Sequence, residues 1–333
     1  MPDRNRQILL VETPKGKLGP EHFRLVEAPL PKPQEGEVLA RVRYISLDAA
    51  NRAWMQGATY RSAVEAGSVM AGGALAEIVE SKSPALRPGD LVFADTGWQE
   101  YAVLPAKRAA KLPRLAPLTH LLSVYGIAGL TAYFGLLRVG KPQPGETVVV
   151  SAAAGSVGSL AGQIAKIKGC RVIGIAGGAE KCAWLTGALG FDAAVDYKAG
   201  PLPKALKAAA PDGIDVYFDN VGGDILETCL FQMRLRGRIA CCGAVSQYDG
   251  TPQAHGPRGV PGLIVVKRLT LQGFIVMDYE AERAAAIAEL KSWVDAGKLM
   301  VQEDIIDGLE NTPRALIGLL AGENKGKRMV KVA

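Results

Sequence analysis

A short turn at residues 151–158 carries the residue types in this chain that are best suited to bind a ligand. The turn reads SAAAGSVG and has the outline of the dinucleotide pattern G-x-G-x-x-G, with Ala153, Gly155 and Gly158 at the glycine positions. At such a turn the second glycine lets the backbone approach a pyrophosphate, and the third lets a helix pack closely on a strand. Free N–H groups and the helix dipole then hold the phosphates. An ordinary buried strand-to-helix turn is the alternative.

The elements around the turn favour the dinucleotide interpretation. Thr147–Val150 reads as a buried strand, and apolar residues at helical spacing follow the turn. A second strand, Cys170–Ala176, ends at Gly177 and Gly178, where a NAD-binding unit usually has an Asp or Glu for the ribose. This small, uncharged tip with Lys181 just beyond it favours NADP(H) over NAD(H).

Two residues near this tip leave alternatives open. Glu180 opposes the choice of NADP(H), unless it points to solvent or caps the following helix. An ordinary solvated lysine is the alternative role for Lys181.

Composition and charge exclude several classes of protein. The 333 residues are 48% apolar and 22% charged, as in ordinary soluble globular proteins. The net charge of +6 is spread over scattered Lys and Arg residues, so we expect no nucleic-acid partner and no membrane patch. The longest apolar run, Ser123–Leu137, is too short to span a bilayer and is expected to form a buried helix.

The cysteines and the N-terminus favour a cytoplasmic location. The five cysteines are odd in number and form no C-x-x-C pair, so neither a disulfide framework nor a metal cluster is indicated. The start, MPDRNRQILL, lacks the apolar region of a signal peptide.

The pattern of strands and helices changes once along the chain. Residues 1 to about 120 have short strands separated by turns, which predict a small barrel; the strands are Ile8–Val11, Val38–Ile45, Leu75–Val79, Leu91–Phe93, Trp98–Leu104 and Ala109–Leu112, with a turn-rich segment at 25–36. From Pro117 strands and helices alternate, which predicts a doubly wound parallel sheet. Residues 299–310 and the tail look β again, so the C-terminus is expected to return to the barrel.

The alternating part is predicted in more detail. After the second strand, the expected helices are Lys181–Leu189, Leu202–Ala210, Asp224–Met233 and Glu280–Ala296. The expected strands are Ala193–Tyr197, Ile214–Asp219, Arg238–Gly243 and Thr270–Val276. The Gly- and Pro-rich loop Gln247–Gly262 is long for a compact domain, and loops of this length are more often functional than not.

Eight motifs together resemble one family: GLTAYFGLL, VVVSAAAGSVGS, IAGGAEK, DAAVDYK, FDNVGG, CCGAVSQY, GFIV and GENKGK. They resemble the zinc-independent medium-chain dehydrogenase/reductases, and within these the reductases of 2-alkenals, prostaglandins or leukotrienes, and curcumin. The resemblance covers nearly the whole chain. It implies an α/β protein with a GroES-like β-barrel domain at residues 1–121 and 301–333. A Rossmann domain, a doubly wound parallel sheet, would span residues 122–300, with NADP(H) between the two. Homodimers are usual in this family.

The resemblance also implies a set of cofactor-binding residues. The pyrophosphate is expected at Ala154, Gly155, Ser156 and Val157, and the 2′-phosphate end at Gly177, Gly178, Lys181 and Tyr197. The residues expected around the ribose and nicotinamide are Asn51, Ile127, Thr131, Asn220, Cys242, Ser246, Tyr248, Phe274, Ile275, Val276, Asn324 and Gly326. For each apolar member, an ordinary core position is the alternative.

No metal site is expected. A catalytic zinc needs at least three clustered Cys, His or carboxylate ligands, but the predicted barrel has no cysteine, and His22 and His120 are far apart in sequence. His255 lies alone in the Pro-rich loop, and all three histidines are expected at the surface. Zinc-dependent alcohol oxidation is therefore disfavoured.

The resemblance implies NADPH-dependent reduction of the C=C bond of an α,β-unsaturated aldehyde or ketone. Hydride would pass to the β-carbon, and Tyr248, Tyr60 or a ribose hydroxyl would stabilise the enolate. One position departs from the family: where these reductases often read D-P-Y-M-R, this chain has Ala50 in place of the tyrosine. Two alternatives remain, an NADPH-dependent quinone reductase and a non-catalytic, crystallin-like NADPH-binding protein.

Overall fold

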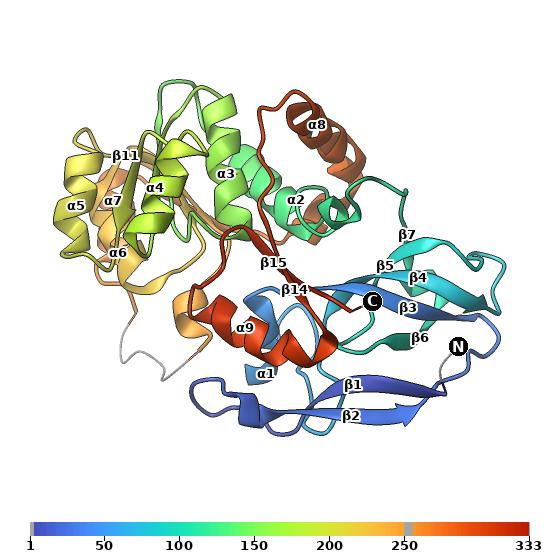
Figure 1. Ribbon diagram of the computed structural model, residues 1–333. Coiled ribbons are helices and arrows are strands. Elements are labelled where there is room, and N and C mark those ends of the chain that lie inside the picture. The colour runs from blue at the N-terminus through green and yellow to red at the C-terminus, as the bar shows by residue number, and fades with distance from the viewer. Residues whose placement is uncertain (1–2, 250–255, 333) are drawn as a thin grey trace.

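Two large sheets organise the chain, which the computed structural model describes over residues 3–249 and 256–332. Figure 1 shows the C-terminal strands β14 (Glu303–Asp307) and β15 (Lys327–Lys331), in red, beside the blue strand β3 (Glu37–Ser46). The seven-stranded sheet thus combines both ends of the chain, while the middle of the chain forms the six-stranded sheet.

Strand β3 curls the seven-stranded sheet into a barrel. It pairs with β4 along one edge, and along the other with β6 in its first half and β15 in its second. Its residues Val38, Leu39 and Ala40 are all buried, because both faces of the strand are covered. The other elements of this GroES-like part are β1 (Arg4–Leu10), β2 (Phe23–Pro29), β4 (Gly73–Ser81), β5 (Leu91–Asp95), β6 (Tyr101–Pro105), β7 (Ala110–Lys111), α1 (Ala50–Gln56) and α9 (Thr312–Leu320).

The six-stranded sheet is parallel throughout, in the order β10-β9-β8-β11-β12-β13. Counted within the domain, this is the strand order of the Rossmann fold, so the predicted doubly wound sheet is confirmed. Its strands are β8 (Thr147–Val150), β9 (Arg171–Ala176), β10 (Ala193–Asp196), β11 (Ile214–Asp219), β12 (Met233–Cys241) and β13 (Thr270–Gly273).

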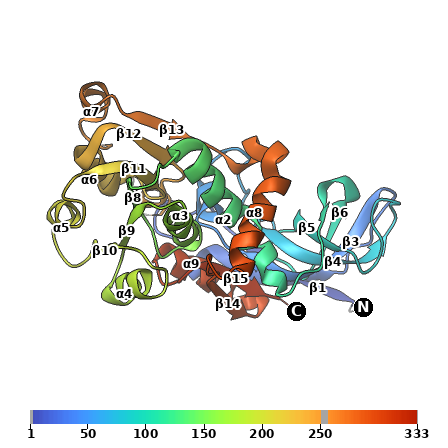
Figure 2. The same cartoon turned by 90° about the horizontal axis from the view of Figure 1, so that it is seen from above.

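Helices cover both faces of this sheet, as Figure 2 shows from above. Val148 and Val150 of β8 face one cluster of apolar side chains and Val149 faces the other, which explains the unbroken run of valines. The first face carries α2 (Ile127–Phe134), α3 (Ser156–Ile167), α4 (Ala179–Gly187) and α8 (Arg283–Asp295). The second carries α5 (Leu202–Ala209), α6 (Gly223–Gln232) and α7 (Val260–Lys267).

Short helical turns link these elements. A π-helical segment, Gly135–Gly140, extends α2. The 3₁₀ turns are η1 (Pro20–His22), η2 (Ala106–Arg108), η3 (Leu118–Leu121), η5 (Val245–Gln247), η6 (Val276–Glu282) and η7 (Leu309–Asn311). In the described part of the chain, no helix has both the length and the hydropathy needed to cross a bilayer.

Several elements differ from the predictions. Strand β2 replaces much of the predicted turn at 25–36, because it lies at a sheet edge and its exposed positions hide the alternation. Strand β13 ends at Gly273 rather than Val276, and α8 begins only at Arg283. Helices α1, α7 and α9 were not predicted. Part of the predicted loop Gln247–Gly262 lies outside the described residues, and its end belongs to α7. The domain boundaries at 121/122 and 300/301 stay predictions.

Candidate active site

A cavity of about 1140 Å³ lies at the carboxyl edge of the six-stranded sheet. One wall comes from the turn after β8, the tip of β9 and the loops after β11 and β12. The other comes from the loop before α1 and the end of α9 with the segment after it. Open α/β sheets bind ligands at this edge, where the strand order reverses between β8 and β11. The volume is slightly above the usual range for ligand sites, about 300–1,000 Å³.

Close backbone packing shapes the turn after β8. A Cβ atom on Gly158 would lie 2.4 Å from the Ala152 carbonyl oxygen, so only glycine fits. Ala152 itself has a left-handed φ of 46°. Within the described part of the chain, the buried Ser156 hydroxyl has no hydrogen-bond partner. An unpaired hydroxyl on the first turn of α3 suits a phosphate oxygen, so the turn fits a pyrophosphate.

The C-terminal strap, residues 321–326, crosses this turn. The Gly326 N–H donates to the Ala154 carbonyl oxygen at 2.9 Å. Gly326 has a left-handed φ of 69°, and a Cβ there would lie 2.1 Å from the Gln302 carbonyl oxygen. The buried Asn324 amide donates to the Gly326 carbonyl oxygen at 2.8 Å. The strap therefore closes the phosphate end of the cavity through contacts that need glycine at Gly326.

Cations gather at the tip of β9. Lys181 donates to the Gly322 carbonyl oxygen at 2.6 Å. Burial, and then the cations Lys198, Arg328 and Lys325, lower the pKa of Lys181. Glu180, which could have opposed an anion here, is paired with Lys325 at 2.6 Å. The local charge is therefore suited to bind an anion such as a 2′-phosphate.

The side chains after β10 complete this end of the cavity. A Cβ on Gly177 would lie 3.0 Å from the Tyr197 hydroxyl and 2.9 Å from the Lys198 side chain. Both Tyr197 and Lys198 line the cavity wall. The small tip of β9 therefore leaves room for a phenol and a cation where a NAD-binding unit would have a carboxylate.

Replacing Lys181 with alanine should weaken NADPH binding about tenfold and leave NADH binding nearly unchanged, because only NADPH carries the 2′-phosphate. Isothermal titration with each cofactor measures this. In the unmutated protein, we expect NADPH to bind at least about tenfold tighter than NADH. The exposed Lys298 offers a control, since Lys298→Ala removes the same charge outside the cavity. Equal losses for both cofactors would contradict the role of Lys181.

Asn220 and the loop after β11 form the middle of the cavity wall. The Asn220 backbone N–H and side-chain amide donate to the hydroxyl and the carbonyl oxygen of Ser151, at 2.9 and 2.7 Å. The buried Asp219 Oδ1 accepts the Tyr217 hydroxyl at 2.7 Å and the Val221 and Gly222 N–H groups at 3.0 and 2.9 Å. This carboxylate fixes the loop that presents Asn220.

Cys242 and Tyr248 line the cavity after β12. Burial, mainly, with the Asp219 carboxylate and Cys241, raises the pKa of Cys242 to about 12, so this thiol is neutral and is not a nucleophile at neutral pH. The Tyr248 hydroxyl accepts the Ala244 N–H at 3.2 Å. A phenol has one hydrogen to donate besides its acceptor sites. No group in residues 3–249 and 256–332 accepts that hydrogen from Tyr248, so a bound substrate can accept it.

Most of the predicted cofactor-binding residues meet at this cavity. Those in its wall are Ala154, Gly155, Ser156, Val157, Gly177, Lys181, Tyr197, Asn220, Cys242, Ser246, Tyr248 and Asn324. Gly326 reaches the turn through its backbone, and Gly178 donates its N–H to Asp196 at 2.9 Å. Their roles in binding stay predictions.

The other predicted residues lie outside the cavity wall. Tyr60 is 54% exposed and packs edge-on against Trp54. Asn51 is buried and bonds the Asp48 N–H and the Ala71 carbonyl oxygen. On α2, Ile127 is exposed and Thr131 half-buried. After β13, Phe274 packs edge-on against Phe218, Ile275 is exposed, and Val276 packs on the core.

Three polar groups at the site were not predicted from the sequence: Asp219, Lys198 and Lys327. Asp219 is the last residue of a predicted strand and lies inside the motif FDNVGG. Its place at the carboxyl end of a parallel strand could have identified it as a residue of the site. Lys198 follows Tyr197 directly and could have been found in the same way. The buried Lys327 lies 2.5 Å from Asp48 in the cavity wall, but 279 residues separate the two in sequence, so no local pattern indicates this pair.

No group of three or more His, Cys, Asp or Glu side chains in residues 3–249 and 256–332 could hold a metal ion. His22 is buried rather than at the surface, contrary to the prediction, because its ring bonds the Gly19 backbone. His120 is half-buried and packs edge-on against Tyr125, so it also departs from the predicted surface position. His255 lies outside the described residues.

Comparisons with known proteins agree with this geometry. Residues 6–112 match a family model described as the N-terminal domain of oxidoreductase, and residues 156–292 match one described as zinc-binding dehydrogenase. The chain is 43% identical to the NADPH-dependent curcumin reductase of Escherichia coli, over 99% of this chain and 97% of that protein. It is 45% identical to prostaglandin reductase 1 of Bos taurus, over 93% of each.

A solved structure extends the match to three dimensions. CurA of Vibrio vulnificus, in complex with NADPH, superposes with a TM-score of 0.94 at 40% identity, over 98% of this chain and 99% of that one. The chain belongs to the medium-chain dehydrogenase/reductase family, within its zinc-independent double-bond reductases, and these are NADPH-dependent oxidoreductases.

Proposed function

We propose that this protein reduces the C=C bond of α,β-unsaturated aldehydes and ketones with NADPH as cofactor. The position of Tyr248 is the main support: this residue lines the cavity in the loop after β12, where its hydroxyl accepts the Ala244 N–H. The cationic tip of β9 and the turn after β8 suit the phosphates of NADPH. The names of the relatives, which act on prostaglandins and curcumin, agree with a substrate of this kind.

Bound NADPH supplies a hydride for the β-carbon of the substrate. The chain itself binds and orients: the turn after β8 would hold the pyrophosphate, and Lys181 and Tyr197 the 2′-phosphate end. The Tyr248 hydroxyl would donate a hydrogen bond to the carbonyl oxygen of the substrate, where negative charge develops. The α-carbon would then take a proton from a tyrosine or from water. Tyr60 does not line the cavity, but it lies near Asp48 and Tyr248, which do.

The absorbance of the reduced cofactor, followed with a panel of enals, enones and quinones, tests the proposal. We expect oxidation of NADPH with enals and enones, and a saturated carbonyl as product. Turnover of quinones alone would replace the proposal by a quinone reductase. NADPH binding with no turnover of any panel member would favour a non-catalytic protein.

Exhaustive chelation should leave this activity unchanged, because the chemistry proposed here uses a phenol and a bound cofactor rather than a Lewis acid. The check is turnover before and after dialysis against a strong chelator, together with elemental analysis. One zinc per chain, lost together with activity, would contradict the expectation.

We also propose a homodimer in which the β13 edges of two chains meet. All four residues of β13 are exposed, and β13 lies at the end of the sheet order. Leu271 of β13 is 38% exposed, and exposed apolar side chains also occur on the neighbouring strand β12, with Leu235 at 57%, and on α7, with Val265 at 72%. An exposed, unpaired strand edge of this kind favours pairing with a second copy about a two-fold axis.

Replacing Leu271 with lysine should convert the dimer into a monomer, because a charge would face its own copy across the two-fold axis. Light scattering during size-exclusion chromatography measures the mass. Leu25→Lys is the matched control, since Leu25 is an exposed leucine on the edge strand β2. A monomer before substitution would contradict the proposal, and so would a dimer that Leu271→Lys leaves intact.

A cytoplasmic location fits the cysteines. All five are free, as in a reducing compartment. Fractionation of cells that express the protein tests this part of the proposal.

A further inference from the structure

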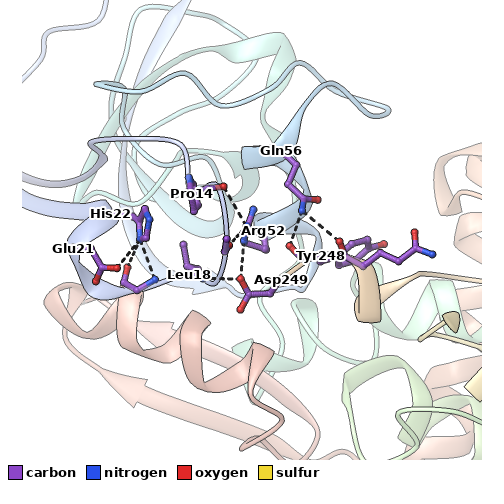
Figure 3. A network of polar contacts seen from close by, with 11 residues as sticks. Pro14, Leu18, Glu21, His22, Arg52, Gln56, Tyr248 and Asp249 are labelled. Carbon is purple, nitrogen blue, oxygen red and sulfur yellow. Dashed lines mark hydrogen bonds and ion pairs between the residues drawn. The ribbon is translucent and has the colours of Figure 1, made fainter. Parts of the chain in front are cut away.

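Arg52, a buried arginine of α1, is at the centre of the contacts between the barrel and the loop after β12. Its side chain is 1% exposed. Its Nε donates to Asp249 Oδ1 at 3.1 Å, across the two domains, and Nη2 donates to the Gly16 carbonyl oxygen at 2.7 Å. Figure 3 shows the guanidinium between the loop at Pro14 and the Asp249 carboxylate. A buried guanidinium requires a charged partner, so Asp249 is held at this position.

Asp249 joins three segments. Its Oδ1 also accepts the Leu18 N–H at 2.7 Å, so one carboxylate oxygen binds both α1 and the loop that precedes η1. The residue directly before Asp249 is Tyr248, and its carbonyl oxygen accepts a hydrogen bond from the Gln56 side chain of α1 at 3.0 Å. Figure 3 shows these contacts on adjacent residues of the loop. The backbone that directly follows the Tyr248 side chain is thereby tied to the barrel.

The other end of this loop is tied to the loop after β11, at the edge of the Rossmann sheet. Ser246 donates its N–H and its hydroxyl to the Val221 carbonyl oxygen, at 3.1 and 2.6 Å. Tyr248 therefore lies between an anchor on the sheet and an anchor on the barrel. The position of its phenol depends on both.

We propose that Arg52 and Asp249 are positioning residues: their ion pair fixes the loop after β12 against the barrel and so holds the Tyr248 hydroxyl at the cavity. This inference rests on the proposed function, in which Tyr248 donates to the substrate. Neither Arg52 nor Asp249 is assigned contact with the reacting atoms. Because the pair connects the two domains, it also determines how the cavity is closed on this side.

A double-mutant cycle on turnover is the first test. Asp249→Asn keeps the shape and the acceptor oxygen but removes the charge, and should lower kcat at least about fivefold, within the usual coupling range of neighbouring residues. In a Tyr248→Phe background, Asp249→Asn should lower kcat less than about twofold, because the hydroxyl that Asp249 positions is already absent. NADPH affinity and the melting temperature are measured for every variant.

Matched variants separate this role from a general loss of fold. Asp212→Asn removes the same charge from an exposed turn at the amino end of β11, and should change nothing. Gln56→Ala removes the contact with the Tyr248 backbone from an exposed position, and should lower kcat in the same direction by a smaller factor. An equal fold-loss from Asp249→Asn with and without the Tyr248 hydroxyl would overturn the positioning role.

Hydrogen exchange provides a readout that does not depend on activity. In Asp249→Asn, the amides of residues 245–249 should exchange at least about tenfold faster, while those of β8 and β11 stay unchanged. Unchanged exchange at 245–249 would overturn the inference even if turnover falls. If the unmutated protein reduces no enone, the proposed function and the role in turnover fail together. The exchange result then decides separately whether the ion pair holds the loop.

Discussion

Tyr248→Phe is expected to lower turnover of an enone at least about tenfold, and up to about 100-fold, while NADPH affinity stays nearly unchanged. The change removes one oxygen from a side chain in the cavity wall and keeps the ring that packs there. The loss is expected because no group in the described part of the chain accepts the hydrogen of this hydroxyl, which can therefore stabilise the developing enolate. Its acceptor side already binds the Ala244 N–H.

Single-turnover measurements with NADPH and an enone separate this effect from product release. Tyr44→Phe, the same chemical change in the barrel strand β3, is the control and should leave turnover unchanged. A larger loss from Tyr60→Phe than from Tyr248→Phe would transfer the donor role to Tyr60. If the Tyr248 variant stays within about twofold of the parent, less than about 0.5 kcal/mol of barrier, the ribose hydroxyl is the better candidate.

The phosphate end of the site could be predicted because its chemistry is local in sequence. Gly155, Ser156 and Gly158 lie within one turn, and the tip of β9 follows one helix later, so strand and helix periodicity alone bring them together. The absence of an acidic residue at Gly177 and Gly178 also indicated the anion site. The ion pair in which Lys325 neutralises Glu180 could not be predicted from a local sequence pattern, because these residues are 145 positions apart.

The closure between the domains could not be predicted, for a physical reason. It depends on isolated polar residues that acquire meaning only when they are buried together, such as Arg52 with Asp249. Each is an ordinary charged residue in its own segment. The same holds for helix α9, whose apolar positions are interpretable only once the returning strand β15 places the helix against the barrel.

Gly158→Ala is expected to weaken NADPH binding at least about 100-fold, or roughly 2.7 kcal/mol. The added methyl would lie 2.4 Å from the Ala152 carbonyl oxygen and 2.9 Å from the Ala153 Cα, and both contacts are to backbone. No rotation of a side chain can relieve them. The start of α3 must therefore move away from the turn, and the N–H groups that would hold the pyrophosphate move with it.

Stability should also fall, because overpacking against fixed backbone costs about 1–3 kcal/mol. Thermal unfolding and calorimetric titration with NADPH, performed on the same sample, distinguish the two effects. Gly187→Ala is the matched control: a Cβ there meets nothing within 4 Å, so it should bind NADPH normally and melt at the same temperature or slightly higher. A folded Gly158→Ala protein that binds NADPH within about threefold of the parent would show that the pyrophosphate does not depend on this turn. In that case the remaining contacts of the cofactor, at the cationic tip of β9 and along the loop after β11, would have to account for its affinity.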